Sequence, residues 1–297
     1  MPDIFGPKYY IENDSFSIQY MYRKGFSTMS TPHFHPFYEI YFLLQGERTY
    51  FINGNIYTAR RGDMILVNPY DVHRTTSSEV QEFERILINF KETFVPPGGA
   101  QTLVRFLPFA QGSSLVRFSM KEQPVVEQMI REMLTECENQ QDGYVEYIKS
   151  LMSQLLIKIF RQSTEAKQEP LQYAHPMHQK ISEIATHLNH HFQENITLEQ
   201  TAKQFYISTS YLSRVFKKVT GFHFREYLQL IRVKEAQRLL RESHEKVLTI
   251  AEKTGFEHVA HFNTTFKKVT GMTPLRYRKH NRNSVPHPVG QEQDYSM

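Results

Sequence analysis

Four lysine side chains that could bind phosphate stand in two copies of one hexapeptide. The sequence Phe-Lys-Lys-Val-Thr-Gly occupies residues 216–221 and returns unchanged at residues 266–271, 50 positions later. Ammonium groups clustered on one surface neutralise phosphates and release counterions, which is the sequence-independent part of nucleic-acid binding. A lysine pair near a helix C-terminus is also typical of a solvated helix face. Duplication of the whole unit favours phosphate contact for Lys217, Lys218, Lys267 and Lys268.

A second residue with reactive chemistry is Cys137, the only cysteine in the chain. It stands in the segment Thr-Glu-Cys-Glu-Asn-Gln, without a neighbouring histidine or arginine that would stabilise a thiolate. A single cysteine also excludes an intramolecular disulfide. We therefore interpret Cys137 as a small packed residue and not as a nucleophile.

The elements that must position the lysine pairs are two similar helical units. Residues 196–221 and 247–271 each predict a short helix, a turn and a second helix that ends at the glycine of the hexapeptide. Ser208 is expected to cap the second helix of the first unit. Each unit also has a small residue where its helices approach and an apolar plug at the turn: Ala202 and Ile207, then Ala251 and Phe256. We expect caps and plugs to match in both units.

A continuous amphipathic segment joins the two units. Residues 224–241 carry one apolar stripe, formed by Tyr227, Leu228, Ile231, Ala236, Leu239 and Leu240. At about 1.5 Å per residue such a helix is ~27 Å long. This length is of the same order as the ~34 Å that separates successive major-groove faces on one side of B-DNA. The duplication therefore predicts one chain with two recognition helices for adjacent major grooves.

Positive charge is concentrated in the C-terminal part of the chain. Residues 175–297 contain 18 Lys and Arg against 11 Asp and Glu, whereas residues 1–174 contain 17 against 20. The basic part predicts a polyanionic partner, double-stranded DNA. No apolar run reaches the ~18 residues that a membrane span needs. The N-terminus lacks the basic-then-apolar layout of a secretory signal, so we expect a cytoplasmic protein without a membrane partner.

The N-terminal part shows the apolar and polar alternation of β-strands. Turns are expected at residues 45–46, 53–55 and 61–63, between strands at residues 16–23, 38–44, 48–54, 64–71 and 83–90. Many short strands with close turns predict a sandwich or a small barrel. Two amphipathic helices follow, with apolar stripes at Val126, Met129, Ile130 and Met133, and at Ile148, Leu151, Leu155 and Ile159.

These patterns divide the chain into domains. Residues 1–165 are expected to form the strand-rich domain with its two helices, and residues 177–282 the helical domain. Residues 166–176 read as a linker, because the surrounding segment has two prolines and no apolar periodicity. Residues 283–297 are expected to be a flexible tail.

The helical part resembles the AraC/XylS-type bacterial transcription regulators. The resemblance covers roughly residues 178–282 and includes the segments YLSRVFKKVTGFHFREYLQLIRVKEAQRLL and IAEKTGFEHVAHFNTTFKKVTGMTPLRYRK. It implies an α+β multidomain fold: an N-terminal cupin-like β-barrel with two dimerisation helices, then an all-α domain with two helix-turn-helix units. It also implies RNA polymerase as a partner and a homodimer.

The resemblance places the base-reading residues by position. The predicted DNA-binding set, besides the four lysines, is Ser208, Ser210, Ser213, Arg214, Val259, Ala260, Asn263 and Thr264. Arg214 can make a bidentate contact to guanine, whereas Asn263 and Thr264 favour adenine or a thymine methyl. Two positions depart from the family pattern: Tyr206 stands where glycine is common, and Thr264 where arginine is common.

The N-terminal strands resemble the cupin-like effector domain of such regulators. His33 and His35 share strand parity with Glu39, and His73 stands where a later cupin histidine occurs. With Tyr41, these residues are expected to converge in the barrel and bind a small effector, by resemblance a sugar or a derivative. His33, His35, Glu39 and His73 are also a sound ligand set for a divalent transition metal. The alternative is hydrogen bonding in the core or to an effector, without metal.

The two helix stripes are expected to form a dimer interface, because a small barrel offers only one side to pack against. The alternative is that both stripes pack entirely on their own barrel. Two function classes also stay open. One is an effector-responsive regulator, expected to be an activator, and the other is a metal-dependent cupin enzyme fused to a DNA-binding domain. An enzyme has no evident use for two helix-turn-helix units, so we favour the regulator and predict no catalytic residues.

Overall fold

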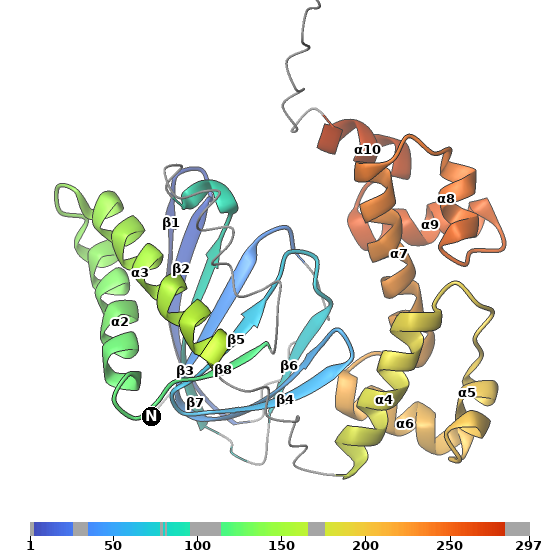
Figure 1. Cartoon of the computed structure of the whole chain (residues 1–297), viewed down its shortest axis with the longest axis horizontal. Helices are drawn as coiled ribbons and strands as arrows, with labels where there is room; N and C mark the ends of the chain where they lie inside the picture. The colour runs from blue at the N-terminus through green and yellow to red at the C-terminus, as the bar shows by residue number, and fades with distance from the viewer. Residues whose placement is uncertain are drawn as a thin grey trace, which may run out of the picture. The chain divides into compact units, whose positions relative to one another are not determined.

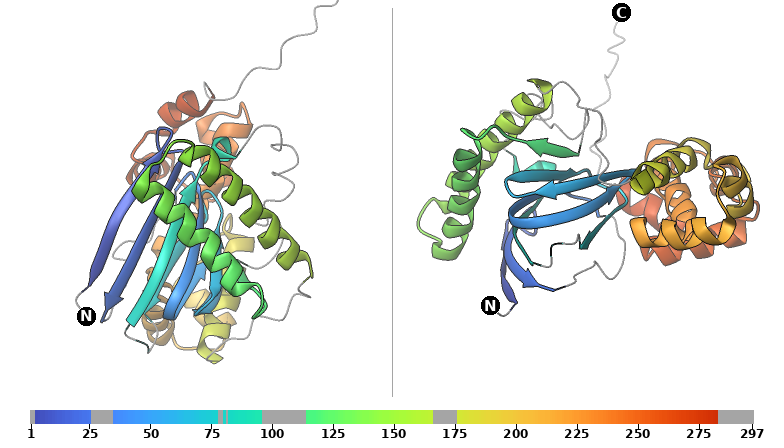
Figure 2. Two further views of the ribbon diagram at one scale, coloured as in Figure 1. Left: turned by 90° about the vertical axis from the view of Figure 1, so that its left-hand side faces the viewer. Right: turned by 90° about the horizontal axis from the view of Figure 1, so that it is seen from below.

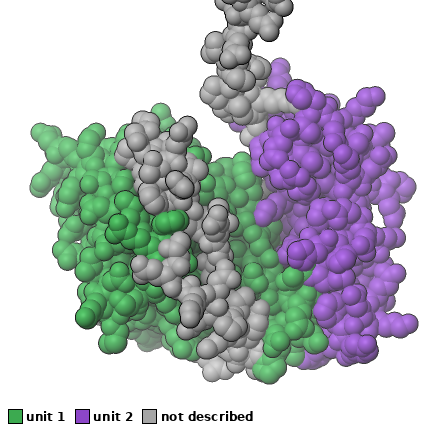
Figure 3. All heavy atoms as spheres, viewed as in Figure 1, with its two compact units in different colours: residues 1–186, 214–222 green, residues 187–213, 223–297 purple. Residues whose placement is uncertain are grey.

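The computed structural model describes residues 3–25, 35–77, 80, 82–95, 114–165 and 176–282 (Figure 1). The chain divides into two compact units, residues 1–186 with 214–222 and residues 187–213 with 223–297 (Figure 3). An antiparallel sheet with two helices is followed along the chain by a series of helices, which confirms the predicted α+β fold class. Most of the predicted linker, residues 166–175, and the predicted tail, residues 283–297, lie outside the described residues.

The sheet contains eight described strands, and all of its pairs are antiparallel. Its order is β1-β2-β7-β3-β5-β8, and β4 and β6 also pair with β3. The strands are β1 (Ile4–Ile11), β2 (Phe16–Lys24), β3 (Tyr38–Ile52), β4 (Asn55–Arg60), β5 (Asp63–Val67), β6 (His73–Ser77), β7 (Glu82–Phe90) and β8 (Leu115–Arg117). A short 3-10 turn, η1 (Glu92–Phe94), follows β7. The expected turns at residues 53–55 and 61–63 are present on either side of β4.

The long strand β3 belongs to both halves of the sheet. Its first half pairs with β5 and β7, and its second half pairs with β4 and β6. A bulge between Leu43 and Gln45 bends the strand. Gly46, at φ +90°, is required just after it, because a Cβ there would lie 2.1 Å from the main-chain oxygen of Glu82. The prediction that a strand ends at residues 45–46 is therefore wrong, because the bulge and the glycine let one strand continue.

Two apolar cores lie on opposite faces of β3 and its neighbours. Ile40 and Phe42 belong to the core shared with the helices, whereas Tyr41 and Leu43 belong to a second core. The second core also contains Tyr50 and other residues from the second half of β3 and from β4. The alternation of strand side chains explains this division. The second core thus lies between the two halves of the folded-over sheet, and we call this space the sheet interior.

The helices α2 (Gln123–Asn139) and α3 (Tyr144–Glu165) cross the outer face of the sheet (Figure 2). All eight apolar residues of the two predicted stripes are at most 7% exposed and belong to the core that these helices share with the sheet. Burial of this kind is the hydrophobic contribution that holds the helices on the sheet. Both stripes are thus buried against the sheet of their own chain. The expectation that they remain available for a dimer interface is wrong.

The C-terminal helices follow the two predicted units. They are α4 (Pro176–His191), α5 (Leu198–Gln204), α6 (Thr209–Thr220), α7 (Phe224–Glu242), α8 (Val247–Lys253), α9 (Val259–Thr270) and α10 (Pro274–Arg282). The pairs α5/α6 and α8/α9 are the two helix-turn-helix units. The joining helix α7 has 19 residues and ends one residue beyond the predicted segment 224–241, and its residues Tyr227, Ala236 and Leu240 are fully buried.

The repeated hexapeptide ends α6 and α9 by the same device. Gly221 and Gly271 adopt φ of +82° and +75°, and each main-chain nitrogen donates to the carbonyl of the lysine four residues earlier. The hydroxyls of Thr220 and Thr270 donate to the carbonyls of Phe216 and Phe266, at 2.7 and 2.8 Å. Both phenylalanines are fully buried. Phenylalanine, threonine and glycine of the hexapeptide therefore have structural roles, and the two lysines are exposed in both copies.

The caps of the two units differ, although the plugs correspond. Ser208 Oγ accepts a hydrogen bond from Tyr211 N at 3.3 Å, as predicted. The second unit has one more residue between its plug and its hexapeptide, so His258 takes the cap position of α9 and makes no side-chain cap hydrogen bond. The expectation that the caps match is wrong, because this extra residue shifts the register at the turn.

One arginine connects parts of the C-terminal unit that are distant in sequence. Arg232 on α7 donates from Nε to Phe192 O and from Nη2 to Glu194 O, both at 2.8 Å. Its guanidinium also lies 5.8 Å from the ring centre of Phe256, the plug of the second unit. Gly255, at φ +81°, completes the contact, because a Cβ there would lie 2.7 Å from Phe192 O. This close approach requires glycine before the second plug.

Candidate functional site

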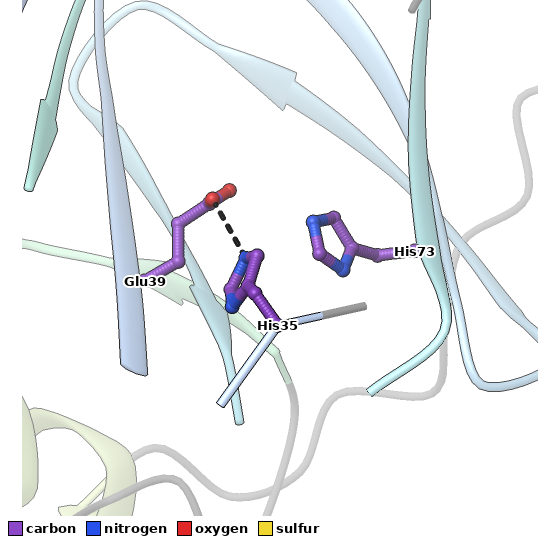
Figure 4. A group of neighbouring side chains, drawn as sticks. All are labelled: His35, Glu39 and His73. Atoms are coloured by element: carbon purple, nitrogen blue, oxygen red, sulfur yellow. Dashed lines mark hydrogen bonds and ion pairs between the residues drawn. The ribbon is translucent and has the colours of Figure 1, made fainter. Parts of the chain in front are cut away.

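Three of the predicted effector residues meet in the sheet interior. His35, Glu39 and His73 are 9%, 4% and 0% exposed, and one potential ligand atom from each lies within 4.8 Å of the others. Figure 4 shows the two imidazole rings and the carboxylate turned toward a common point. His35 Nε2 is 3.2 Å from Glu39 Oε2. His33, the fourth residue of the predicted metal-ligand set, lies outside the described residues.

Two strands, β3 and β6, and the segment before β3 supply these side chains. Glu39, on β3 opposite Asn89 of β7, faces the interior by strand alternation. His73 begins β6, opposite the last residue of β3. His35 precedes β3. The prediction that His35 and Glu39 lie on one strand is therefore wrong. A hydrogen bond from Tyr70 N to His35 O, at 2.8 Å, and stacking of the His35 ring on Phe37, at 4.0 Å, hold His35 in place instead.

Both histidines direct Nε2 toward the common point. His35 Nδ1 lies 2.9 Å from Phe37 O, and His73 Nδ1 lies 2.8 Å from Asp71 O. A carbonyl oxygen only accepts, so each Nδ1 donates to its carbonyl; His35 Nε2 faces the acceptor-only carboxylate of Glu39 and must either donate to it as well or share a cation with it. This support of Nδ1–H by a carbonyl is usual for a histidine whose Nε2 binds a metal. Two imidazole nitrogens and one carboxylate oxygen fit a divalent transition metal by donor type.

Glu39 is ionised at neutral pH despite its burial. Burial alone would raise the pKa of Glu39, but the hydrogen bond with His35 and electrostatic interactions with His73, His35 and Arg85 outweigh this effect. Together they lower the pKa to about 2. The carboxylate can therefore accept a hydrogen bond from a ligand hydroxyl or coordinate a cation.

The sheet interior also holds polar residues that the prediction omitted. Tyr41, which was predicted, packs edge-on against Tyr50 with ring centres 5.0 Å apart. The omitted residues are Arg48, Tyr50, Arg85 and Asn89, all at most 8% exposed. Strand alternation could have found them, because residues 83, 85, 87 and 89 share one face of β7, and 48 and 50 share one face of β3.

The predicted DNA-binding residues of the first unit lie on and just before α6. Ser208, Ser210 and Arg214 are exposed, and Ser213 is half-buried. Lys217 and Lys218 are exposed in the last turn, on the far side of the helix from the buried residues Leu212 and Phe216. Positions 210, 213, 214 and 217 follow the i, i+3, i+4, i+7 spacing of one helix face.

The predicted residues of the second unit are all exposed on α9. They are Val259, Ala260, Asn263, Thr264, Lys267 and Lys268. Thr264 Oγ1 donates to Ala260 O at 3.0 Å, which directs the hydroxyl to its own helix and leaves the methyl for an apolar contact. An exposed histidine, His261, stands on the same helix and was not predicted. Its Nε2 lies 3.4 Å from Gln229 of α7.

Tyr206, where the family commonly has glycine, adopts φ +56° and is 94% exposed. The equivalent residue of the second unit is Gly255, at φ +81°. The turn therefore needs a left-handed residue in both units, and tyrosine accepts this conformation at some cost in free energy.

Cys137 is buried at 1% exposure on α2. Burial, followed by the charges of Glu136 and Glu138, raises the pKa of its thiol to about 12. Its thiolate is therefore scarce at neutral pH, in line with the interpretation as a packed residue. Within the described parts of the chain, no helix combines the length and the apolar character that crossing a membrane requires.

An interior with converging polar groups and two helix-turn-helix units define a class: transcription regulators that join a ligand-binding domain to a DNA-binding domain. Two family models match the chain accordingly. The helix-turn-helix domain matches residues 201–280, and the AraC-like ligand binding domain matches residues 19–156. The chain belongs to the AraC/XylS family of transcription regulators, as its sequence motifs predict.

The chain is similar to two curated regulators over most of its length and to one solved domain over its C-terminal part. The HTH-type transcriptional activator RhaS of Klebsiella pneumoniae (strain 342) is 26% identical over 83% of this chain and 87% of its own length. RhaS of Salmonella arizonae is 28% identical over 86% of this chain and 89% of its own. Among solved structures, the C-terminal domain of the response regulator yesN from Fusobacterium nucleatum is 36% identical, covering 32% of this chain and 94% of that domain, with a TM-score of 0.32. The chain is a DNA-binding, effector-responsive transcription regulator.

Proposed function

We propose that this regulator is an activator that binds a sugar or a sugar derivative in the sheet interior and DNA through α6 and α9. The observation that carries the effector site is the convergence of His35, Glu39 and His73 in a ligand-binding domain. Burying hydrogen-bonding groups costs free energy, whereas apolar residues would fill the same space without that cost. The concentration of polar groups at one point therefore favours a site for a polar ligand. Activation is supported by the relatives, which are named transcriptional activators.

The DNA-binding part of the proposal is supported by exposure and charge. The faces of α6 and α9 carry the predicted base-reading residues, and each helix ends with two exposed lysines. Arg214 is the proposed guanine contact, and the lysines are the proposed phosphate contacts. The regulator is proposed to act in the cytoplasm as a homodimer that contacts RNA polymerase, and not as an enzyme.

A metal ion in the same interior is a second candidate, favoured by the orientation of the histidines. His35 and His73 each donate Nδ1–H to a main-chain carbonyl and turn Nε2 toward Glu39. These three residues, with His33 as the predicted fourth, would hold the ion, which would supply a Lewis-acidic contact to effector oxygens. Elemental analysis of the purified protein and of His73→Ala tests this: bound metal that is lost in the variant supports it, and metal-free protein that still binds effector contradicts it.

The effector site is tested with His35→Ala and with His244→Ala, an exposed histidine outside the site, as the matched control. Operator binding and reporter transcription are measured with and without a panel of sugars and sugar derivatives. We expect His35→Ala to lose the response while binding DNA, and His244→Ala to respond normally. A normal response in His35→Ala would place the effector site elsewhere. Turnover of an added compound by the metal-loaded protein would favour the enzyme alternative instead.

A further inference from the structure

Three histidines stand close together at the C-terminal end of α4, away from the sites described above. His187 and His191 are four residues apart, and His190 lies between them in the sequence. Residues at this i, i+4 spacing are neighbours on one face of a helix. The rings of His187 and His191 are accordingly in contact, with centres 4.6 Å apart and planes inclined by 33°. The same spacing on a helix lets two imidazoles bind one zinc ion.

A carboxylate holds the ring of His191. His191 Nδ1 lies 2.8 Å from Glu194 Oε1, and Glu194 N donates to His191 O at 2.9 Å, which closes the turn after the helix. Because a carboxylate only accepts, Nδ1 is the donor of this pair. Carboxylate support of one ring nitrogen is usual for a histidine whose other nitrogen binds a metal. Among the described residues, Nε2 of His191 makes no hydrogen bond.

The second imidazole, His187, is half-buried against the first helix-turn-helix unit. Its ring packs edge-on against Phe205, which directly follows α5, with ring centres 5.6 Å apart. Within the described part of the chain His187 makes ring contacts but no hydrogen bond, so a ring nitrogen is available to a ligand. Burial, followed by the charge of His191, lowers the pKa of His187. The ring is therefore neutral at pH 7, which is the form that binds a metal ion.

A structural role at the helix end explains these features less well. A protonated histidine near a helix C-terminus interacts favourably with the helix dipole. That role suits the exposed His190. It does not suit His187, whose surroundings disfavour the charged form, and it gives no reason for a second ring in contact with His187.

We propose that Nε2 of His191 and one ring nitrogen of His187 chelate a divalent transition metal of the Zn²⁺, Ni²⁺ and Cu²⁺ class, and that Glu194 positions the His191 ring. Imidazole nitrogens suit these ions, whereas Mg²⁺ and Ca²⁺ prefer oxygen ligands. Among the described residues, no third ligand group closes around this pair as it does in the sheet interior. Water completes the coordination, so the ion is exchangeable and not a permanent structural metal.

The proposed metal site adjoins the contact that joins α4 to α7. Phe192 O and Glu194 O, which accept hydrogen bonds from Arg232 of α7, follow His191 directly in the chain. A bound ion would restrain the last turn of α4 and the segment that Arg232 holds. Because the ion binds the folded pair and not the separated histidines of an unfolded chain, it should raise Tm in proportion to its concentration.

The test uses the full-length protein with Zn²⁺ and Ni²⁺ as probes and Mg²⁺ as the control ion. Titration calorimetry and thermal shift are measured on wild type, His187→Gln and His191→Gln. His244→Gln is the matched control, because His244 is an exposed histidine of the same unit outside the pair. The same titrations on His73→Ala separate this site from the sheet interior, because metal bound to the α4 pair persists in that variant.

We expect Zn²⁺ and Ni²⁺, but not Mg²⁺, to bind and to raise Tm. His187→Gln and His191→Gln should each weaken binding at this site by roughly tenfold or more, because either change leaves one ligand and removes the chelate. His244→Gln should bind as wild type does. Glu194→Ala should weaken binding by roughly tenfold, through loss of the support of His191 Nδ1. Glu194→Gln keeps an acceptor oxygen and should lose less.

Three results would overturn the inference. One is that His73→Ala binds neither Zn²⁺ nor Ni²⁺, and another is that His191→Gln binds both ions as wild type does. The third is that His190→Gln loses affinity while His191→Gln does not, which would assign the ligand to the wrong histidine. His191→Gln is decisive if His187→Gln melts early without metal, because the His191 side chain is 45% exposed and its replacement leaves the core unchanged.

Discussion

Arg214 is the side chain on α6 that is best suited to read a base, because its guanidinium can bond both acceptors of a guanine edge. It is exposed on the predicted face of the helix. Arg214→Ala should lower affinity for the specific operator by about 1 to 3 kcal/mol and relax specificity at one base position. Competition binding against operators varied at single positions measures both effects. Equal loss on specific and random DNA would make Arg214 a phosphate contact.

The exposed lysines at the ends of α6 and α9 should act on all sequences alike. Lys267→Ala, or Lys217→Ala, should lower affinity for specific and random DNA together and reduce the slope of log K against log salt by about 1. Affinity measured across a salt series tests this, with Lys121→Ala in the sheet-containing part as the control. An unchanged slope in all four single lysine variants would mean that these lysines form a solvated helix face and do not contact phosphate.

The sequence was informative about single residues wherever spacing determines position. Glu39, Tyr41 and His73 were placed in one interior from their types and from the family resemblance, and the exposed residues of α9 follow from helical periodicity. Arg48 and Arg85 were omitted because a buried arginine is rare, although strand alternation places both on the interior face of their strands. His35 was chosen for the wrong reason, since it reaches the interior from the segment before β3.

At the scale of elements, Gly255 and Tyr206 make a matched pair. Both precede the plug of a helix-turn-helix unit and both have positive φ, but Gly255 approaches Phe192 O closely whereas Tyr206 is 94% exposed. Gly255→Ala should destabilise the protein by about 1 to 3 kcal/mol, through backbone strain and the close contact. Tyr206→Gly should be neutral or stabilise by up to about 1 kcal/mol, because it relieves the strain. Chemical denaturation of both variants measures these changes.

Stability of Gly255→Ala equal to that of wild type would show that the turn can move away from Phe192. A loss in Tyr206→Gly would show that the tyrosine ring has a role that its exposure does not reveal. DNA binding is also measured on both folded variants. A loss of DNA affinity in folded Tyr206→Gly would indicate that Tyr206 contacts DNA directly.

Most strands and helices could be predicted from the sequence, but where they continue or begin could not always be predicted. The strands at residues 16–23, 38–44 and 83–90 and the helices α6, α7 and α9 follow from alternation and periodicity. The joining of residues 38–52 into one strand depends on a bulge and on the contact of Gly46 with Glu82, which is 36 residues away. The cap of α9 was missed because one additional residue in a turn moves the register. Both errors come from single-residue insertions that leave the local pattern intact.

At the scale of the whole molecule, dimerisation stays a prediction of the family resemblance. The stripes of α2 and α3 cover the sheet, so a dimer that forms through these helices must use their outer faces, where Val125 and Tyr147 are 46% and 47% exposed. We expect a dimer of the full-length protein in sedimentation experiments at micromolar concentration. Val125→Glu with Tyr147→Glu should weaken it by roughly tenfold or more without lowering Tm. Leu151→Glu would serve only as a folding control, since Leu151 is 5% exposed.

A monomer at micromolar concentration would contradict the dimer, and a dimer that the double variant leaves unchanged would place the interface outside α2 and α3. Binding to operators with one or two half-sites distinguishes these cases further, because a two-fold pair of chains requires paired half-sites for full affinity.

The bend of β3 has a consequence for how a bound ligand would be detected. Glu39 and Arg48 lie on one strand, on either side of the bulge, and the strand is hydrogen-bonded in both halves of the sheet. A ligand that contacts both residues would close this bend against opening motions. Amide hydrogen exchange should therefore slow on both sides of Gly46 together, in β5 and β7 as well as in β4 and β6, while β1 at the sheet edge changes little. Slowing confined to one half would mean that the ligand contacts only that half.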